Sequence, residues 1–122
     1  MRTMEHTSLT HGRFTYDPTV DALFVRIPGD YKVSIRQKGF TIDINPKGAI
    51  IAVEILDASK VLGIAQEVLE HHDRWECRVK AQEKTISVEF TFAVRTGAEV
   101  HAALNDKAKV DYPETRMAVS AE

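Results

Sequence analysis

The chain has 122 residues, 43% of them apolar and 28% charged. This is long enough for one domain with a modest core, and the composition excludes a fibrous or disordered protein. The net charge of −2 argues against a large basic surface for nucleic acid, because such binding depends on clustered Lys and Arg. The single cysteine, Cys77, cannot form an internal disulfide, and no segment has the apolar length of a signal peptide or membrane span. We therefore expect a cytoplasmic protein that does not enter membranes.

The first half of the chain predicts short antiparallel strands. Residues 1–12 are polar and aperiodic, which predicts a flexible tail, with a single domain over 13–122. Arg13 to Tyr16 is a short strand that ends at Asp17-Pro18, a dipeptide typical of turns. Apolar and polar residues then alternate with a period of two, the pattern of half-buried strands, over residues 22–27, 32–37 and 40–44.

A turn and a helix are predicted next. Asn45-Pro46-Lys47-Gly48 fits a type I hairpin turn. The strand that follows, Ala49 to Leu56, is apolar on both faces except at Glu54, which indicates a central position. Asp57 or Ser59 can serve as the N-cap of a helix over residues 60–72. This helix has an apolar stripe that packs on the sheet: Val61, Ile64, Ala65, Val68, Leu69 and His72.

The second half predicts a hairpin and a second, shorter helix. Trp75, Cys77 and Val79 lie on one face of a strand, and residues 86–94 alternate in the same way after a loop at 81–84. Thr96 and Glu99 have the spacing of a capping box, which predicts a helix over about 97–106. The predicted fold class is therefore α+β: an antiparallel meander of about four strands with one packed helix, extended over residues 73–122 by a β-hairpin and a short helix.

Two motifs in the first half resemble a known family. They are Tyr16-Asp17 with Asp21-Ala22-Leu23, and the run from Val53 through Glu54-Ile55-Leu56 to Asp57-Ala58-Ser59. Over residues 13–62 the chain is similar to the small prokaryotic family known as domain of unknown function 2283. The resemblance implies a compact antiparallel sheet with one helix. Because some relatives are encoded beside small toxin-like proteins, it also implies an antitoxin-like role by analogy. Asn45-Pro46-Lys47 replaces the acidic turn usual in the family, which makes a metal-binding loop there less plausible.

Candidate metal ligands lie in two places. Asp17 and Asp21 could form a carboxylate pair, but carboxylates at turns usually accept hydrogen bonds from nearby backbone amides, and we expect these two to shape the corner between strands. His71, His72 and Cys77 are also metal-ligand types, yet their spacing matches no zinc motif. A helix C-terminus explains the histidines, because their charge complements the helix dipole. Cys77 is typical of a small buried hydrophobe.

Charged residues on the predicted strands suggest two further surfaces. Arg26, Asp43 and Glu54 could converge on the exposed face of the sheet, either as an ion-pair network or as a binding site. A short basic strip could form from Lys32, Arg36 and Lys38, with Phe24 and Tyr31 offering stacking to nucleic acid; a solvated face is the simpler interpretation.

The sequence favours a non-enzymatic protein-interaction module. It has no nucleophile motif and no glycine-rich nucleotide loop, so we assign no catalytic or cofactor-binding residue. We expect a homodimer, an inhibitor or antitoxin-like partner of another small protein, or both, with Trp75, Phe90 and Phe92 as candidate contact residues. A small metal-dependent hydrolase and a weak nucleic-acid-binding protein are the alternatives.

Overall fold

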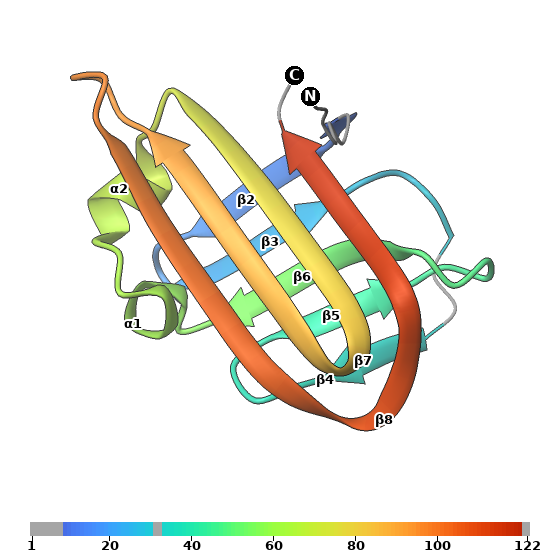
Figure 1. Cartoon of the computed structure of the whole chain (residues 1–122). Helices are drawn as coiled ribbons and strands as arrows, with labels where there is room; N and C mark the ends of the chain where they lie inside the picture. Colours follow the sequence, from blue (N-terminus) through green and yellow to red (C-terminus); the bar gives the residue numbers. More distant parts are fainter. Residues whose placement is uncertain (1–8, 31–32, 121–122) are drawn as a thin grey trace, which may run out of the picture.

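Most of the chain folds into two β-sheets, seen face-on in Figure 1. The structure is a computed structural model that describes residues 9–30 and 33–120. The first sheet has five antiparallel strands. In spatial order they are β2 (Arg13–Asp17), β3 (Ala22–Arg26), β6 (Ile50–Leu56), β5 (Thr41–Ile44) and β4 (Val33–Arg36).

The order of the first sheet differs from the predicted meander. β2 and β3 form one hairpin and β4 to β6 form a second unit, but β3 pairs with β6 rather than with β4. Each strand was recognisable from its alternating residues, whereas alternation says nothing about which strands are neighbours. The central position expected for Ala49 to Leu56 is confirmed, since β6 lies in the middle of the sheet and is buried except at Glu54 and Leu56.

The second sheet is built from two long strands that are bent into nested hairpins. β7 (Arg74–Ala93) and β8 (Glu99–Ser120) pair antiparallel along almost their whole length, with register shifts around Glu83. Figure 1 shows that each strand turns back on itself, so that the two arms of β7 lie inside the two arms of β8. The outer arms are Glu99–Lys107, paired with Thr85–Ala93, and Thr115–Ser120, paired with Glu76–Ala81.

The N-terminal end of the described chain joins the two sheets. Thr10–His11 form β1, which pairs parallel with Val119–Ser120 of β8, so this part of the expected tail is a strand. Gly12 follows, and its amide donates to the carbonyl of Ser120 (2.8 Å). A Cβ at position 12 would clash with Cγ1 of Val119, so only glycine fits where the chain passes from the second sheet to the first.

One hydrophobic core lies between the sheets. The inward rows of both sheets contribute to it, including Leu23, Val25 and Val53 from the first and Val79, Ile86 and Phe90 from the second. Because residues 74–120 form a sheet of their own that covers the first, the α+β prediction was wrong, and the protein is a mostly β structure with two sheets. The packing follows the rule that a sheet with one apolar face must bury it against another layer.

The predicted helix over residues 60–72 is replaced by two short ones, α1 (Ala58–Leu62) and α2 (Gln66–Glu70). Gly63 separates them with a left-handed φ of 68° at the C-cap of α1, where glycine carries no steric penalty. The apolar stripe is partly retained, since Ile64 and Leu69 are buried and Val61 and Val68 pack against the core. Within the described residues no helix is long enough to cross a membrane, since α1 and α2 have five residues each.

The second predicted helix, over about 97–106, was wrong, because this segment is the first arm of β8. Thr96 and Glu99 form no capping box. Instead the Thr96 hydroxyl accepts from the amide of Ala98 (3.4 Å), and Gly97, with φ of 90°, completes a tight turn. The segment is a strand because Val100, Ala102 and Leu104 alternate toward the core. There they continue the row of inward-facing apolar residues on the paired arm of β7.

Candidate functional site

The most highly connected polar group in the described chain is the carboxylate of Asp21. Its Oδ1 accepts the hydroxyl proton of Tyr16 (2.6 Å) and the backbone amide of Ser59 (3.0 Å). Its Oδ2 accepts the hydroxyl proton of Ser59 (2.7 Å). These three residues come from β2, the β2–β3 turn and α1, so the carboxylate joins the first hairpin to the first helix.

The backbone around this corner is shaped for the same contact. Asp21 and Asp57 both have a left-handed φ, 55° and 54°, a region that Asp and Asn enter more readily than most residues. The amide of Ala58 donates to the carbonyl of Asp21 (2.8 Å). Asp57, expected as an N-cap, makes no side-chain capping bond. The amides at the start of α1 are instead satisfied by Asp21, a residue distant in the sequence.

The electrostatics of this corner favour a fixed charge over acid–base chemistry. Partial burial alone would raise the pKa of Asp21, but the hydrogen bonds donated by Tyr16 and Ser59 outweigh it and hold the pKa of this carboxyl below its ordinary value. Burial and the bond to Asp21 raise the pKa of the Tyr16 phenol. Tyr16 therefore stays neutral and Asp21 stays ionised at neutral pH, with the donors already in place.

Asp17 has a smaller and separate role. Its Oδ1 accepts the amide of Thr19 (2.9 Å), an exposed turn contact within the same loop. Asp17 and Asp21 thus each bond to backbone amides, as expected for residues that shape a corner. The sequence did not identify Ser59 as the partner of Asp21, because nothing in the local pattern links the two positions.

The other candidate metal ligands face different environments. Cys77 is completely buried and burial raises the pKa of its thiol, so its side chain behaves as a small apolar group. Nδ1 of His72 donates to the carbonyl of Val68 (2.8 Å) at the end of α2, whereas His71 is exposed beside Glu70. Among the side chains described, those of residues 9–30, 33–107 and 114–120, no three of His, Cys, Asp or Glu gather closely enough to hold a metal ion.

The aromatic residues expected at a partner interface lie inside the protein. Trp75, Phe90 and Phe92 are 6%, 1% and 0% exposed. Phe90 and Phe92 stack with ring centroids 5.6 Å apart, and Phe14 meets both Trp75 (5.4 Å) and Phe92 (5.7 Å). Since the first sheet covers these rings, they are not available to another chain, and the interface prediction for them loses its basis.

The outer face of the first sheet holds charged residues that do not form a network. Arg26 and Asp43 flank Ala52 on the neighbouring strands. Arg26 donates to the carbonyl of Gly29 (3.1 Å), and Asp43 accepts from the hydroxyl of Ser34 (2.6 Å). Glu54 is exposed between Phe24 and Thr41. The three predicted residues share a face, but among the described contacts none pairs with another.

The predicted basic strip is also not assembled in the described residues. Arg36 is exposed on the edge strand β4 and is separated from Phe24 on β3 by two strands, β5 and β6. Lys38 lies in the following turn, where its amide donates to Asp106 (3.1 Å). Lys32 and Tyr31 lie outside the described residues.

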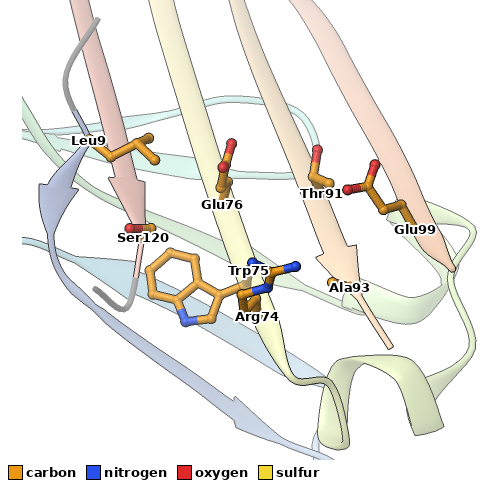
Figure 2. Close-up of a pocket in the computed structure, with 8 residues that line it drawn as sticks. All are labelled: Leu9, Arg74, Trp75, Glu76, Thr91, Ala93, Glu99 and Ser120. Carbon is orange, nitrogen blue, oxygen red and sulfur yellow. The ribbon is translucent and has the colours of Figure 1, made fainter. Parts of the chain in front are cut away.

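A shallow cleft opens at one end of the second sheet (Figure 2). Its volume is about 350 Å³ and its lining mixes charged and apolar side chains, with Glu76 and Glu99 on different arms and the edge of Trp75 at its base. Glu76 accepts from Arg78 (3.4 Å) and Glu99 lies 3.5 Å from His101. Each of these two carboxylates therefore lies beside a basic side chain, Arg78 or His101.

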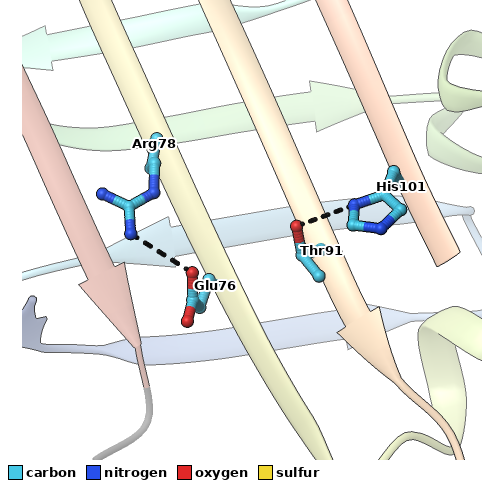
Figure 3. A network of polar contacts seen from close by, with 4 residues as sticks. All are labelled: Glu76, Arg78, Thr91 and His101. Atoms are coloured by element: carbon cyan, nitrogen blue, oxygen red, sulfur yellow. Dashed lines mark hydrogen bonds and ion pairs between the residues drawn. The ribbon is translucent and has the colours of Figure 1, made fainter. Parts of the chain in front are cut away.

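The rest of this outer face is a polar, solvated surface. Figure 3 shows the Arg78–Glu76 pair on one arm, and the hydrogen bond between Thr91 and Nδ1 of His101 (3.1 Å) that joins β7 to β8. Exposed ion pairs of this kind contribute about 0–1 kcal/mol. The Arg78–Glu76 pair runs along one strand, and of the two contacts only the Thr91–His101 hydrogen bond crosses between strands.

The fold and its polar corner define a small two-sheet β protein in which a carboxylate connects a hairpin to a helix. The chain belongs to the family described as "Protein of unknown function (DUF2283)", whose model matches residues 13–59. A protein of Methanosarcina mazei named "Putative hypoxanthine phosphoribosyltransferase" is 31% identical over 83 residues, which is 67% of this chain and 68% of that protein. No solved structure was found to match.

Tyr16, Asp21 and Ser59 all fall within the matched segment of residues 13–59. They are also residues of the two motifs by which the family resemblance was recognised in the sequence. The hydrogen bonds among them give these motifs a structural role, since they hold β2, the β2–β3 turn and α1 together.

Proposed function

We propose that this protein is a non-enzymatic protein-interaction module that binds another chain by strand addition to the open edge of its second sheet. The supporting observation is the first arm of β8, Glu99–Lys107. It pairs with β7 on one side, and no described strand pairs with its other side. Such an edge offers a row of amide and carbonyl groups to an incoming strand.

The direction of the hydrogen bonds shows which groups are open. The amide of Val94 donates to the carbonyl of Ala98, and the carbonyl of Ala93 accepts from Asp73 on the opposite side of β7. In an antiparallel ladder, hydrogen-bonded and non-hydrogen-bonded pairs alternate. The even-numbered residues of this arm therefore bond to β7, and the odd-numbered ones direct their backbone groups outward: Glu99, His101, Ala103 and Asn105.

The side chains along this edge are incompletely covered. Val100, Ala102 and Leu104 point toward the core and pack against it, yet all three are only partly buried. The corresponding row of the inner arms, Ile86, Val88 and Phe90, is at most 1% exposed. An added strand would cover the remaining apolar surface, which stabilises the pair by about 25 cal/mol per Å² removed from water.

Hypoxanthine binding is the competing function, because the name of the Methanosarcina mazei relative contains it. A purine needs a concave, mostly apolar pocket with a few convergent polar groups. The cleft of Figure 2 is shallow and its lining is rich in charged side chains, Arg74, Glu76 and Glu99, rather than mostly apolar. We therefore expect the melting temperature to stay unchanged when hypoxanthine is added.

The substitution Ala103→Pro tests the interaction function. The backbone amide of Ala103 faces outward, so proline at this position removes a hydrogen-bond donor from the edge while the bonds to β7 remain. We expect the wild-type protein to associate, with itself or with a native partner, and Ala103→Pro to lose association at an unchanged melting temperature. Ala103→Ser, which keeps the amide, is the control. Association that survives in Ala103→Pro would contradict the proposal.

A further inference from the structure

We infer that the strand added at this edge comes from a second copy of the chain, paired antiparallel about a two-fold axis that passes beside Ala102. This inference rests on the proposed function, because it names the partner that the open edge takes. It is carried by three features of the arm Glu99–Lys107: the extent of its free backbone groups, the order of its inward side chains, and the placement of its charges.

The free backbone groups have a defined centre. The outward amide of Lys107 is already used, since it donates to Oδ1 of Asp106 (2.9 Å), and the side-chain amide of Gln37, turned so that its nitrogen faces β8, would donate to the Lys107 carbonyl (3.2 Å). The open run therefore extends from Glu99 to Asn105, and its midpoint is Ala102. Antiparallel pairing about that midpoint matches every open residue with an open residue of the second copy, which leaves no edge group unpaired.

The inward side chains are self-complementary in the same register. Val100 lies opposite Leu104 of the second copy, and Ala102 lies opposite its own equivalent. The three partly buried residues then form a continuous apolar row that extends each core into the other. A shift of one residue, with Ala103 at the axis, would place Val100 against the carboxylate of Asp106, which is already bonded to the amides of Lys38 and Lys107. Burial of the apolar face therefore favours the register about Ala102.

The outward side chains are compatible with this register. Glu99 lies opposite Asn105 of the second copy, with Lys107 of that copy at the diagonal position, where long side chains still reach each other. His101 lies opposite Ala103, so no like charges face each other. A two-fold contact of this kind is isologous, the usual arrangement in homodimers.

Single cysteine variants test the register, because only residues that lie opposite each other in the dimer can form a disulfide. The natural thiol, Cys77, is completely buried and does not compete. In the inferred pairing, Ala102 and its equivalent form a non-hydrogen-bonded pair with Cα atoms about 4.5 Å apart, within the range that a disulfide spans. Equivalent Ala103 residues would be diagonal, at about 7–8 Å, beyond easy bridging. Glu89→Cys, on an inner arm and exposed, is the control for random collision.

We expect the wild-type protein to form a dimer whose fraction rises with protein concentration. On mild oxidation, Ala102→Cys should give at least ten times more disulfide-linked dimer than Ala103→Cys or Glu89→Cys. Melting temperatures of the reduced variants show whether each is folded. Faster bridging of Ala103→Cys, or a dimer in which Ala102→Cys does not bridge, overturns the inference. If the protein is a monomer that binds a different protein, and Ala103→Pro loses this binding, the inference of a second copy is wrong but the proposed function stands. A monomer with no partner overturns both.

Discussion

The two halves of the chain are held together by different kinds of interaction. In the segment matched by the family, residues 13–59, a hairpin and a helix are joined by hydrogen bonds to one carboxylate, that of Asp21. In residues 74–120, two long strands pair with each other, and the side chains that they contribute to the core are apolar, Trp75, Phe90 and Val119 among them. The first half therefore depends on a few polar contacts with specific partners, whereas the second depends on backbone pairing and apolar burial.

This difference explains which half is recognisable from its sequence. A polar corner requires particular residues at particular positions, such as Tyr16, Asp21 and Ser59, and so produces a motif. A buried strand row tolerates apolar residues of similar volume. Function that depends on an edge of the second sheet would then leave little trace in side-chain identity, because strand addition uses backbone groups.

The largest expected effect is the loss of an aromatic ring from the shared core. Phe92→Ala removes a fully buried side chain that contacts Phe90, Phe14 and His72. We expect the free energy of unfolding in urea to fall by about 3–5 kcal/mol. Glu89→Ala, exposed on the same arm, is the control and should change it by less than about 0.5 kcal/mol. If hydrogen exchange showed that only residues 74–120 open while the first sheet stays protected, the single shared core would be wrong.

A smaller loss is expected at the polar corner. Asp21→Ala leaves the amide of Ser59 without its acceptor and removes the partner of Tyr16, so we expect a loss of about 1.5–3 kcal/mol, the range for hydrogen bonds to a charged group. Asp17→Ala removes one exposed turn contact and should cost about 0.5–1 kcal/mol. Urea unfolding of both variants measures the difference. Equal losses would mean that Asp21 is only another turn residue.

The smallest effect concerns pH. The folded-state pKa of Asp21 lies below its ordinary value, so the unfolded chain binds this proton more readily. The stabilisation is complete above about pH 4, the ordinary pKa of Asp, and is lost as the pH falls through the folded-state value. Wild type should therefore lose more stability than Asp21→Asn between pH 7 and pH 3 in urea unfolding. If the stability of the two proteins changed equally with pH, the charge on Asp21 would not contribute to stability as we expect.

Local patterns in the sequence predicted the strands of the first sheet well, because a period of two directly reports a face that is buried. They did not predict that β3 pairs with β6, since neighbour order depends on how loops pass over the sheet. The predicted helix over 60–72 failed at Gly63, where a left-handed residue ends α1. That glycine could have been used as a stop signal, because glycine just after an apolar stripe often marks a helix end.

The second half was harder to predict because two local signals conflicted. The spacing of Thr96 and Glu99, and the Ala-rich residues that follow, favour a helix. The alternation of Val100, Ala102 and Leu104 instead indicates a strand. Tertiary pairing with β7 decided in favour of the strand, as it commonly overrides local propensity. The burial of Trp75, Phe90 and Phe92 was missed for a related reason. Their aromatic area exceeds what one hairpin can cover, but here a whole second layer covers it.

The candidate site was predictable in part. The interpretation of Asp17 and Asp21 as corner residues follows from turn chemistry, and the hydrogen bonds of both agree with it. The contact between Asp21 and Ser59 could not be read from a single sequence, because it joins residues from separate elements. The open edge at Glu99–Lys107 could not be read at all, since an edge is defined only once the neighbours of each strand are known.

The parallel pairing of β1 with the end of β8 has a consequence for biosynthesis. Thr10–His11 are synthesised more than a hundred residues before their partners Val119–Ser120. At about 5–20 residues per second, the first strand waits several seconds for a neighbour. Such distant pairing also slows folding in general. The edge of β1 therefore stays without its neighbour during much of synthesis, when chaperones and proteases can reach it.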